Sequence, residues 1–470
     1  MLRFRLFLCA LLLPAAAAVA QPAANGSASA APPTLDYEFF KARIEPVFTT
    51  KRPGHARCIS CHGDGTPMKL TPLPEGSAAW TETQARANFD IIRARVVPGN
   101  PEQSRLLRHP LAEEAGGDPH HDGGKHWTSK SDPEWQTLLA WVNGATLTSA
   151  AASTATLHAR VIQTNSAGDD VSIIDPTTNK VVGQVVGIEV NHGAAAAPDG
   201  SKIYVSNEAN STLDVVDART LRVMSRIPLS GHPNNISISH DGKRVYIAIR
   251  EQKGVVDVVD TASLARVKSI PIKGAGHNTY VTPDGKYVVA GSVAGSSMTI
   301  IDQKTEEVVW DMVFDKGVRP LAFEQNKDGS TKRVFVQLTD YNGFAVVDFA
   351  THKELQRIAL PKIAAGKKEV MEGGNTSHGM AVTADNTRLI VNSRLNSAVY
   401  IYSLPDLKLV GGVDVGIAPD WVTLTPDGKM AYVANAGSNS VSVVDMAGVK
   451  EVTRIPVGQV PKRNITAMLP

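Results

Sequence analysis

The chain of 470 residues predicts a small all-α domain followed by an all-β, seven-bladed propeller. Its length exceeds one ordinary domain, helical patterning precedes the propeller region, and one β-rich unit recurs from residue 158 onward. We expect five segments in chain order: a signal peptide at 1–20, a disordered linker at 21–34, the α domain at 35–146, a second linker at 147–157 and the propeller at 158–470.

The N-terminus predicts export. Arg3 and Arg5 precede an apolar run that closes in Ala18-Val19-Ala20, an A-x-A site of the kind that signal peptidase cuts. A retained membrane anchor would need about 20 apolar residues and a charged stop beyond them, whereas Gln21-Pro22 and an Ala/Ser-rich stretch follow here. We therefore expect a periplasmic or otherwise exported protein with no stable membrane span.

The charge balance excludes partners that need a broad basic surface. Removing Arg3 and Arg5 with the signal lowers the formal net charge from +2 to 0 (2 − 2). No basic field then remains to attract nucleic acid or a membrane surface. We expect no nucleic-acid partner, and local sites for a redox partner protein or a small-molecule substrate.

The cysteines predict a covalently bound haem. Of the three in the chain, Cys9 falls in the signal, which leaves Cys58 and Cys61 in the run Cys58-Ile59-Ser60-Cys61-His62. In C-x-x-C-H two thiols attach to one haem and the histidine ligates its iron. A thioredoxin-like pair would need a βαβ setting and a zinc site a second ligand pair. We therefore predict one haem c, with His62 as the proximal iron ligand.

Two helices are predicted to flank this motif. Residues 35–48 carry apolar side chains at helical spacing, although Pro46 limits the regularity of the end. The second helix begins at Asp132-Pro133-Glu134, which combines a capping residue, an early proline and an acidic first turn. It ends at Asn143-Gly144. Terminal helices that pack across one another around a haem are the plan of a small cytochrome c.

Residues 37–144 resemble the cytochrome c domains of planctomycete and acidobacterial exported proteins. The segments that carry the resemblance are FFKARIEPVF, CISCHGDG, VVPGNPEQSRLLRHPL, HHDGGKHW and SDPEWQTLLAWV. The resemblance implies a cytochrome c domain that transfers electrons. Such domains commonly carry an H-x-G-G run, which falls here on His121 and makes it the first candidate for the distal ligand. His126, His109 and Met68 are the alternatives.

The propeller is predicted from a repeated phrase. A tight turn followed by an apolar strand recurs at 198–207, 240–249, 283–292 and 426–435, and a second strand ending in Asp follows each turn. Related strands bring the number of units to seven, with Ser403 in the Asp place of one of them. Four short strands per unit are typical of propeller blades. The repeats resemble the YVTN family of β-propellers, which implies the fold and leaves the activity open.

The first unit lacks an inner strand. The last ten residues, from Pro461, align with the inner strand that starts at Pro419. We predict that the C-terminus closes the ring inside the first blade and hides strand edges that would otherwise stay open.

Aligning the blades on their turns predicts a ring of side chains near one mouth of the central channel. Its members are Lys462, His192, Asn234, His277, Leu321, His378 and Asp420. The three histidines and Asp420 could converge on a metal such as copper. Two alternatives stay open: an anion or organic-substrate site using the histidines, Arg319 and Lys462, or histidines that only cap turns and bond to neighbouring blades.

These features predict an exported c-type haem protein that transfers electrons, with a propeller that binds a partner or substrate. One alternative is a periplasmic oxidoreductase with a histidine-lined metal or substrate site at the channel mouth. A second alternative is a cell-surface interaction or structural propeller.

Overall fold

The computed structural model describes residues 32–52, 56–63, 66–74, 77, 79–146, 156–370 and 375–470. The chain divides into two compact units, Met1–Leu147 and Thr148–Pro470. The boundary falls at the start of the predicted second linker, 147–157. The predicted signal peptide and most of both linkers lie outside the described residues.

The first unit is helical. Its elements in chain order are α1 (Tyr37–Phe39), the π-helical turn η1 (Phe40–Ile44), α2 (Glu45–Thr49), α3 (Cys58–His62), α4 (Glu82–Arg93), the 3₁₀ turn η2 (Pro101–Gln103), α5 (Arg105–Arg108), the 3₁₀ turn η3 (Glu113–Ala115) and α6 (Pro133–Val142). Within the described ranges, no helix is long and apolar enough to cross a membrane.

The two predicted terminal helices are present and pack together. Asp36 caps α1 by accepting a hydrogen bond from the Phe39 amide, and α1, η1 and α2 follow one another without a break. Asp132 caps α6, whose first residue is Pro133. The Trp141 indole N–H donates to the Asp36 carbonyl across 2.9 Å, and its ring lies 5.6 Å from that of Phe40. The first and last helical segments therefore share one buried aromatic core.

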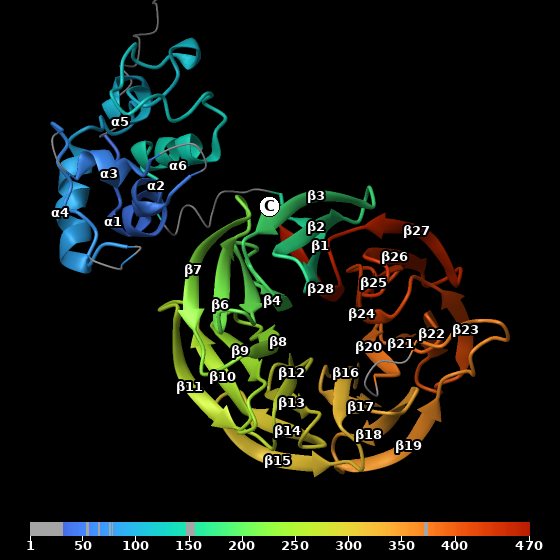
Figure 1. The fold of residues 1–470 in the computed structure, drawn as a ribbon. Coiled ribbons are helices and arrows are strands. Elements are labelled where there is room, and N and C mark those ends of the chain that lie inside the picture. The colour runs from blue at the N-terminus through green and yellow to red at the C-terminus, as the bar shows by residue number, and fades with distance from the viewer. Residues whose placement is uncertain are drawn as a thin grey trace, which may run out of the picture. The chain divides into compact units, whose positions relative to one another are not determined.

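The second unit is a seven-bladed propeller of seven four-stranded antiparallel sheets (Figure 1), as predicted. The inner strands that surround the channel are β28 (Pro461–Leu469), β4 (Asn191–Ala196), β8 (Pro233–Ile238), β12 (Gly276–Val281), β16 (Val318–Gln325), β20 (Ser377–Val382) and β24 (Pro419–Leu424). The second strands are β1 (His158–Asn165), β5 (Lys202–Asn207), β9 (Arg244–Ile249), β13 (Tyr287–Ser292), β17 (Thr331–Leu338), β21 (Arg388–Ser393) and β25 (Met430–Asn435).

The third strands end at the recurrent Asp or its Ser replacement. They are β2 (Asp170–Asp175), β6 (Thr212–Asp217), β10 (Val255–Asp260), β14 (Ser297–Asp302), β18 (Gly343–Asp348), β22 (Ala398–Ser403) and β26 (Ser440–Asp445). The outer strands are β3 (Lys180–Val186), β7 (Arg222–Pro228), β11 (Ala265–Pro271), β15 (Glu307–Val313), β19 (Lys353–Ala359), β23 (Leu409–Asp414) and β27 (Lys450–Pro456).

The repeated Asp-Gly pairs build the turns between inner and second strands. The Asp199 carboxylate accepts a hydrogen bond from the amide of Ser201 at 2.9 Å, and Asp427 does the same with the amide of Lys429 at 3.1 Å. Gly200 follows Asp199 with a φ of 71°, a conformation that residues with a Cβ adopt at a cost. Each turn thus needs both residues of the pair.

The C-terminal strand closes the ring. β28 pairs antiparallel with β1 from His158↔Leu469 to Asn165↔Pro461, so the first blade joins the two ends of the propeller. This pairing confirms the predicted closure and satisfies the backbone groups along one edge of β1.

The prediction of the channel ring was wrong at one position, Leu321. In β16 the pairs Val318↔Leu338 and Leu321↔Val336 match the pairs Asn191↔Asn207 and Ala194↔Val205 of β4. Arg319, not Leu321, therefore occupies the place of His192. β16 carries an extra register shift between Glu324 and Gln325 before its turn, so alignment on the turns displaced this blade by two residues.

We predict that a chain ending at Val460 loses much of its stability, because β1 would then present an open edge and the buried Leu469 would be missing. The loss of ladder hydrogen bonds and core contacts lowers the thermal midpoint of the propeller by about 10 °C or more and promotes self-association. Calorimetry and light scattering measure both effects. Removing only Pro470, which lies outside β28, is the control. An unchanged midpoint in the shorter chain would contradict the role of the closing strand.

Candidate functional site

The C-x-x-C-H motif forms the short helix α3 in the first unit. Because Cys58 and Cys61 stand three residues apart on a helix, their side chains lie on one face, and neither is in a disulfide. The half-buried His62 ring is held by its Nδ1 atom, which lies 3.2 Å from the Met68 carbonyl and 3.0 Å from Thr66 Oγ1. A carbonyl can only accept, so Nδ1 carries the proton and Nε2 keeps a lone pair.

His121 faces His62. Their ring centroids are 6.3 Å apart and their planes are tilted by 33°. The Nδ1 atom of His121 lies 2.6 Å from the Gly124 carbonyl, so the same reasoning leaves the Nε2 lone pair of His121 available. The structure therefore brings together two imidazoles, each held by a backbone carbonyl on one nitrogen and able to ligate a metal with the other.

These residues fit a covalently attached haem. Imidazole nitrogens bind metals at about 2 Å, so two rings on opposite sides of one metal ion have centres roughly 6 Å apart. The separation of His62 and His121 agrees with that spacing. Hydrogen bonds from the second ring nitrogen to carbonyls are the usual outer-shell support of ligating histidines. Cys58 and Cys61 lie on the same helix as His62 and supply the two thiols that c-type attachment requires.

The other candidates for the distal ligand occupy different places. His109 packs edge-on against His121 at 4.9 Å and its Nδ1 lies 3.3 Å from Asp118 Oδ2. His126 lies edge-on to Trp127 at 5.5 Å. Met68 holds His62 through its backbone carbonyl. His121 is thus the candidate that the fold places opposite His62.

Sequence reasoning missed the residues that position the two imidazoles. Thr66 contacts His62 and donates to the Met68 carbonyl at 3.1 Å. Gly124 has a φ of 76°, and a Cβ on Gly123 would lie 3.0 Å from Cε1 of His121. The two glycines of the H-x-G-G run therefore allow the turn that holds His121.

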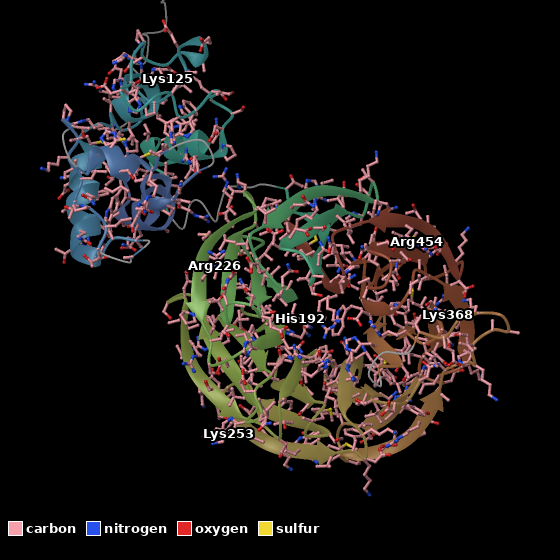
Figure 2. The ribbon with its side chains drawn as sticks, viewed as in Figure 1. Lys125, His192, Arg226, Lys253, Lys368 and Arg454 are labelled. Carbon is pink, nitrogen blue, oxygen red and sulfur yellow. The ribbon has the colours of Figure 1, made fainter. Side chains whose placement is uncertain are left out.

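In the propeller, the ring predicted at the channel is present, with Arg319 in place of Leu321. His192 is buried on the inner face of the ring (Figure 2), and its Nδ1 lies 3.2 Å from Glu208 Oε2. The His277 and His378 rings meet edge-on at 5.4 Å. His378 Nδ1 donates to the Asp420 carbonyl across 2.7 Å.

Asp420 is the centre of a buried ionic cluster that the sequence revealed only in part. Its fully buried carboxylate forms an ion pair with Arg394 and lies 3.3 Å from Arg463 Nη1 and 3.7 Å from Lys462 Nζ. Although burial opposes ionisation, Lys462, Arg394 and Arg463 hold the pKa of Asp420 well below its usual value. Arg394 and Arg463 were absent from the predicted ring.

The histidines of the ring are neutral at pH 7. Burial lowers the pKa of His192 to about 4, against the opposing effect of its hydrogen bond to Glu208. Burial also holds the pKa values of His277 and His378 well below 6.5. The charges that remain around Asp420 are therefore those of the arginines and Lys462.

The observed contacts of His192, His277, His378 and Asp420 show how well these residues suit the predicted copper site. In the part of the chain that the structure describes, no three or more His, Cys, Asp or Glu side chains are grouped so as to hold a metal ion. His192 is bonded to Glu208, and Asp420 is already surrounded by cations. The surroundings favour an anion over a metal cation.

Comparison with known proteins finds relatives of part of the second unit. Residues 165–277 match the family described as YNCE-like beta-propeller. This part of the propeller is thus similar to the YNCE-like family. Proteins named uncharacterized protein YncE, from Salmonella typhi and from Salmonella typhimurium, are each 22% identical over 93 residues, which cover 20% of this chain and 26% of theirs. The chain thus spans about a quarter of the length of these curated relatives.

Solved structures share the fold of the propeller. Hydrazine synthase of Kuenenia stuttgartiensis is 25% identical with a TM-score of 0.53, over 61% of this chain and 92% of that one. The periplasmic gluconolactonase PpgL of Pseudomonas aeruginosa is 19% identical with a TM-score of 0.54, over 66% of this chain and 100% of that one. The second likeness shows the fold alone.

The buried histidines predict acid sensitivity. A histidine whose folded pKa lies near 4 and whose unfolded pKa is 6.5 destabilises the folded state as pH falls between those values. For His192 this amounts to about 3 kcal/mol of unfolding free energy lost between pH 7 and pH 4. Chemical denaturation from pH 7 to pH 4 measures the decline.

His192→Gln is expected to reduce that decline, and the exposed His158→Gln is the control that keeps the wild-type slope. A wild-type unfolding free energy that stays constant from pH 7 to pH 4 would contradict the assignment of neutral buried histidines.

Proposed function

We propose that the protein is an exported c-type haem protein that transfers single electrons and whose YNCE-like propeller binds a redox partner or a substrate. The observation that carries the haem part is the facing pair His62 and His121, 6.3 Å apart beside the two free cysteines of α3. The export signal predicted at 1–20 and the C-x-x-C-H motif agree with this proposal, because haem attachment to such motifs accompanies export.

The first unit would hold the haem through named residues. Cys58 and Cys61 would form the two thioether bonds, His62 would be the proximal ligand and His121 the distal one. Haem bound in this way supplies reversible one-electron oxidation and reduction of iron. The carbonyls of Met68 and Gly124 hold the two imidazoles through Nδ1, so the Nε2 atoms would be the ones to ligate the iron.

Two imidazole ligands favour electron transfer over catalysis at this centre. If His62 and His121 both ligated the iron, no position would be left open to a small ligand. The buried side chains of Ile59, Leu111 and Trp127 add an apolar core to this unit. The first unit is thus suited to relaying electrons, and any substrate chemistry would be placed in the propeller.

His121 provides the sharpest test of this proposal. In the protein produced with the c-haem attachment machinery, we predict that His121→Ala converts a low-spin iron into a high-spin one that binds added imidazole, because the distal ligand is gone. Electron paramagnetic resonance and visible spectra report the change. The reduction potential is expected to rise as well, since a strong nitrogen donor is lost.

His120→Ala is the matched control. His120 is the exposed neighbour whose Nε2 pairs with Asp122 at 2.7 Å, and its loss should leave the iron low-spin. A low-spin spectrum that survives His121→Ala but is lost on His109→Ala, His126→Ala or Met68→Ala would assign the distal position to that residue. The absence of any covalently bound haem would overturn the function.

A further inference from the structure

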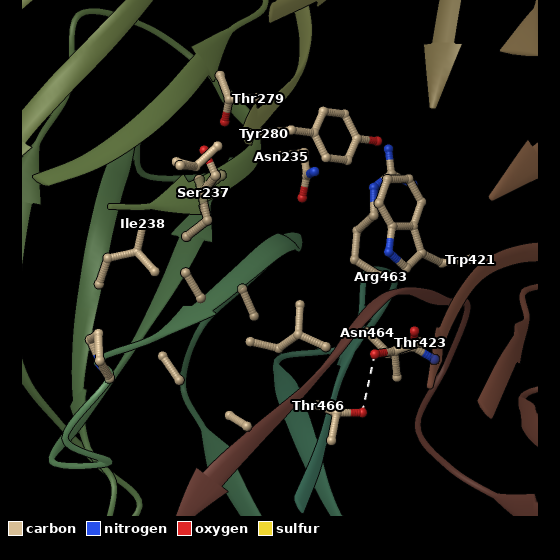
Figure 3. A pocket seen from close by; sticks show the side chains of 18 of the residues that line it. Asn235, Ser237, Ile238, Thr279, Tyr280, Trp421, Thr423, Arg463, Asn464 and Thr466 are labelled. Atoms are coloured by element: carbon tan, nitrogen blue, oxygen red, sulfur yellow. Dashed lines mark hydrogen bonds between the residues drawn. The ribbon is translucent and has the colours of Figure 1, made fainter. Parts of the chain in front are cut away.

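The central channel of the propeller contains a cavity of about 580 Å³. It lies between inner strands β4, β8, β12, β24 and β28, and Tyr280, Trp421 and Arg463 gather at one end of it (Figure 3). Cavities of roughly 300–1,000 Å³ are the usual size for small-molecule sites. The ring of histidines is not part of its lining, so the cavity is distinct from the predicted ring site.

Arg463 is a buried cation in the wall of this cavity. The residue is only 1% exposed, and its guanidinium lies 4.2 Å from the centre of the Trp421 ring. Its Nη atoms reach Asp420 Oδ2 at 3.3 Å and Asn234 Oδ1 at 3.4 Å. Its buried Nε has no hydrogen-bond partner among the described residues. A buried donor without a partner carries a desolvation cost that a bound acceptor would remove.

Arg463 shares its counter-ion. Asp420 is the carboxylate in contact with Arg463, and the same carboxylate also pairs with Arg394 and lies near Lys462. Burial lowers the pKa of Arg463 to about 10, which is still far above neutral pH, so the guanidinium stays charged. An anion at this end of the cavity would give Arg463 a second counter-ion.

Tyr280 adds a second donor beside Arg463. Its hydroxyl oxygen accepts a hydrogen bond from the Leu321 amide at 3.1 Å, which leaves the hydroxyl proton free to point into the cavity. Burial raises the pKa of Tyr280 above its ordinary value, so the group remains a donor. Figure 3 shows the Tyr280 hydroxyl directed toward Arg463 and Trp421.

The rest of the wall combines apolar side chains with the polar side chains of Asn235, Ser237, His240, Thr279, Thr423, Asn464 and Thr466. Small and branched side chains from four inner strands line it: Ala194, Ala195, Ala196, Ile236, Ile238, Val422 and Ile465. The apolar side chains accommodate hydrocarbon, and Arg463 is the one arginine or lysine among the described lining residues. A single cationic end beside apolar side chains suits a small organic acid.

We propose that this cavity binds a small organic monocarboxylate, with its carboxylate against Arg463 and Tyr280 and its hydrocarbon part along the apolar inner-strand residues. The inference rests on the propeller part of the proposed function and is independent of the haem part, because every residue that it uses lies between 194 and 468.

Calorimetric titration of the haem-loaded full chain tests the proposal with benzoate and hexanoate as probes, and with benzamide and hexanamide as uncharged analogues of the same shape. We expect one carboxylate per chain and at least about tenfold weaker binding of each amide, since a charge-assisted hydrogen bond is lost. Repeating the titration on the Cys58→Ser, Cys61→Ser double variant separates this result from any failure of haem attachment.

Three variants locate the site. Arg463→Gln should abolish carboxylate binding, and Tyr280→Phe should weaken it about five- to tenfold by removing one hydrogen bond. Ser237→Leu fills the cavity from a half-buried lining position without altering charge and should also abolish binding. Lys462→Gln is the matched control, because it removes a cation of the cluster that does not line the cavity, and it should change the affinity less than about threefold.

Equal binding of acids and amides, no binding of either acid, or binding that survives both Tyr280→Phe and Ser237→Leu would overturn the proposal. Because the last two variants leave the ionic cluster intact, the test still decides if Arg463→Gln fails to fold.

Discussion

The pairing of β28 with β1 is the constraint on which the rest of the propeller depends. It joins the two ends of the second unit into a closed ring, and a closed ring is what gives inner strands from seven blades a common channel. The same strand carries Lys462 and Arg463 into that channel. Two of the cations around Asp420, Lys462 and Arg463, therefore reach it only when the ring is closed, whereas Arg394 follows β21. Closure of the ring thus completes the ionic cluster. The buried charges in turn need one another, because an isolated ion in this interior would be strongly unfavourable.

In the first unit, a short helix and a tight turn position the predicted haem-binding side chains. α3 sets Cys58, Cys61 and His62 within a single turn and a half of helix, and the turn at Gly123-Gly124 presents His121 from a segment about sixty residues later. Packing of Trp141 on Phe40 and its bond to the Asp36 carbonyl fasten the ends of the unit together. What matters chemically is that both imidazoles are held through Nδ1, since this leaves the same atom of each ring free for a metal.

The repeats of the sequence were sufficient to predict seven blades and their closure, because the Asp-Gly turns and the strand-ending Asp residues are local signals with a direct physical cause. The ring at the channel was predicted from equal spacing to the turn, which works where inner strands have equal length. This alignment failed at Leu321 because β16 is two residues longer than its counterparts before the turn. Arg319 occupies the ring position instead.

Arg463, Trp421 and Arg394 could not be found in this way. Each inner strand has a register shift after its first residue, as between Gln163 and Asn165 opposite β28, and such a bulge breaks the strict alternation of side chains. Neighbouring residues such as Lys462 and Arg463 can then both reach Asp420. Arg394 follows the end of β21, a second strand rather than an inner one, so no alignment of inner strands includes it.

The pairing of His62 with His121 was predicted from the resemblance to a family of cytochrome c domains. A separation of about sixty residues in the sequence gives no local signal that the two side chains meet.

The central claim is that Cys58, Cys61, His62 and His121 hold one haem. Intact-mass measurement of the mature protein, made with the haem attachment machinery and treated with a thiol-alkylating reagent, tests it most directly. The account predicts the mass of the chain without residues 1–20 plus one haem, with no alkylated cysteine. A mature chain that carries two alkylated cysteines and no added haem would contradict it.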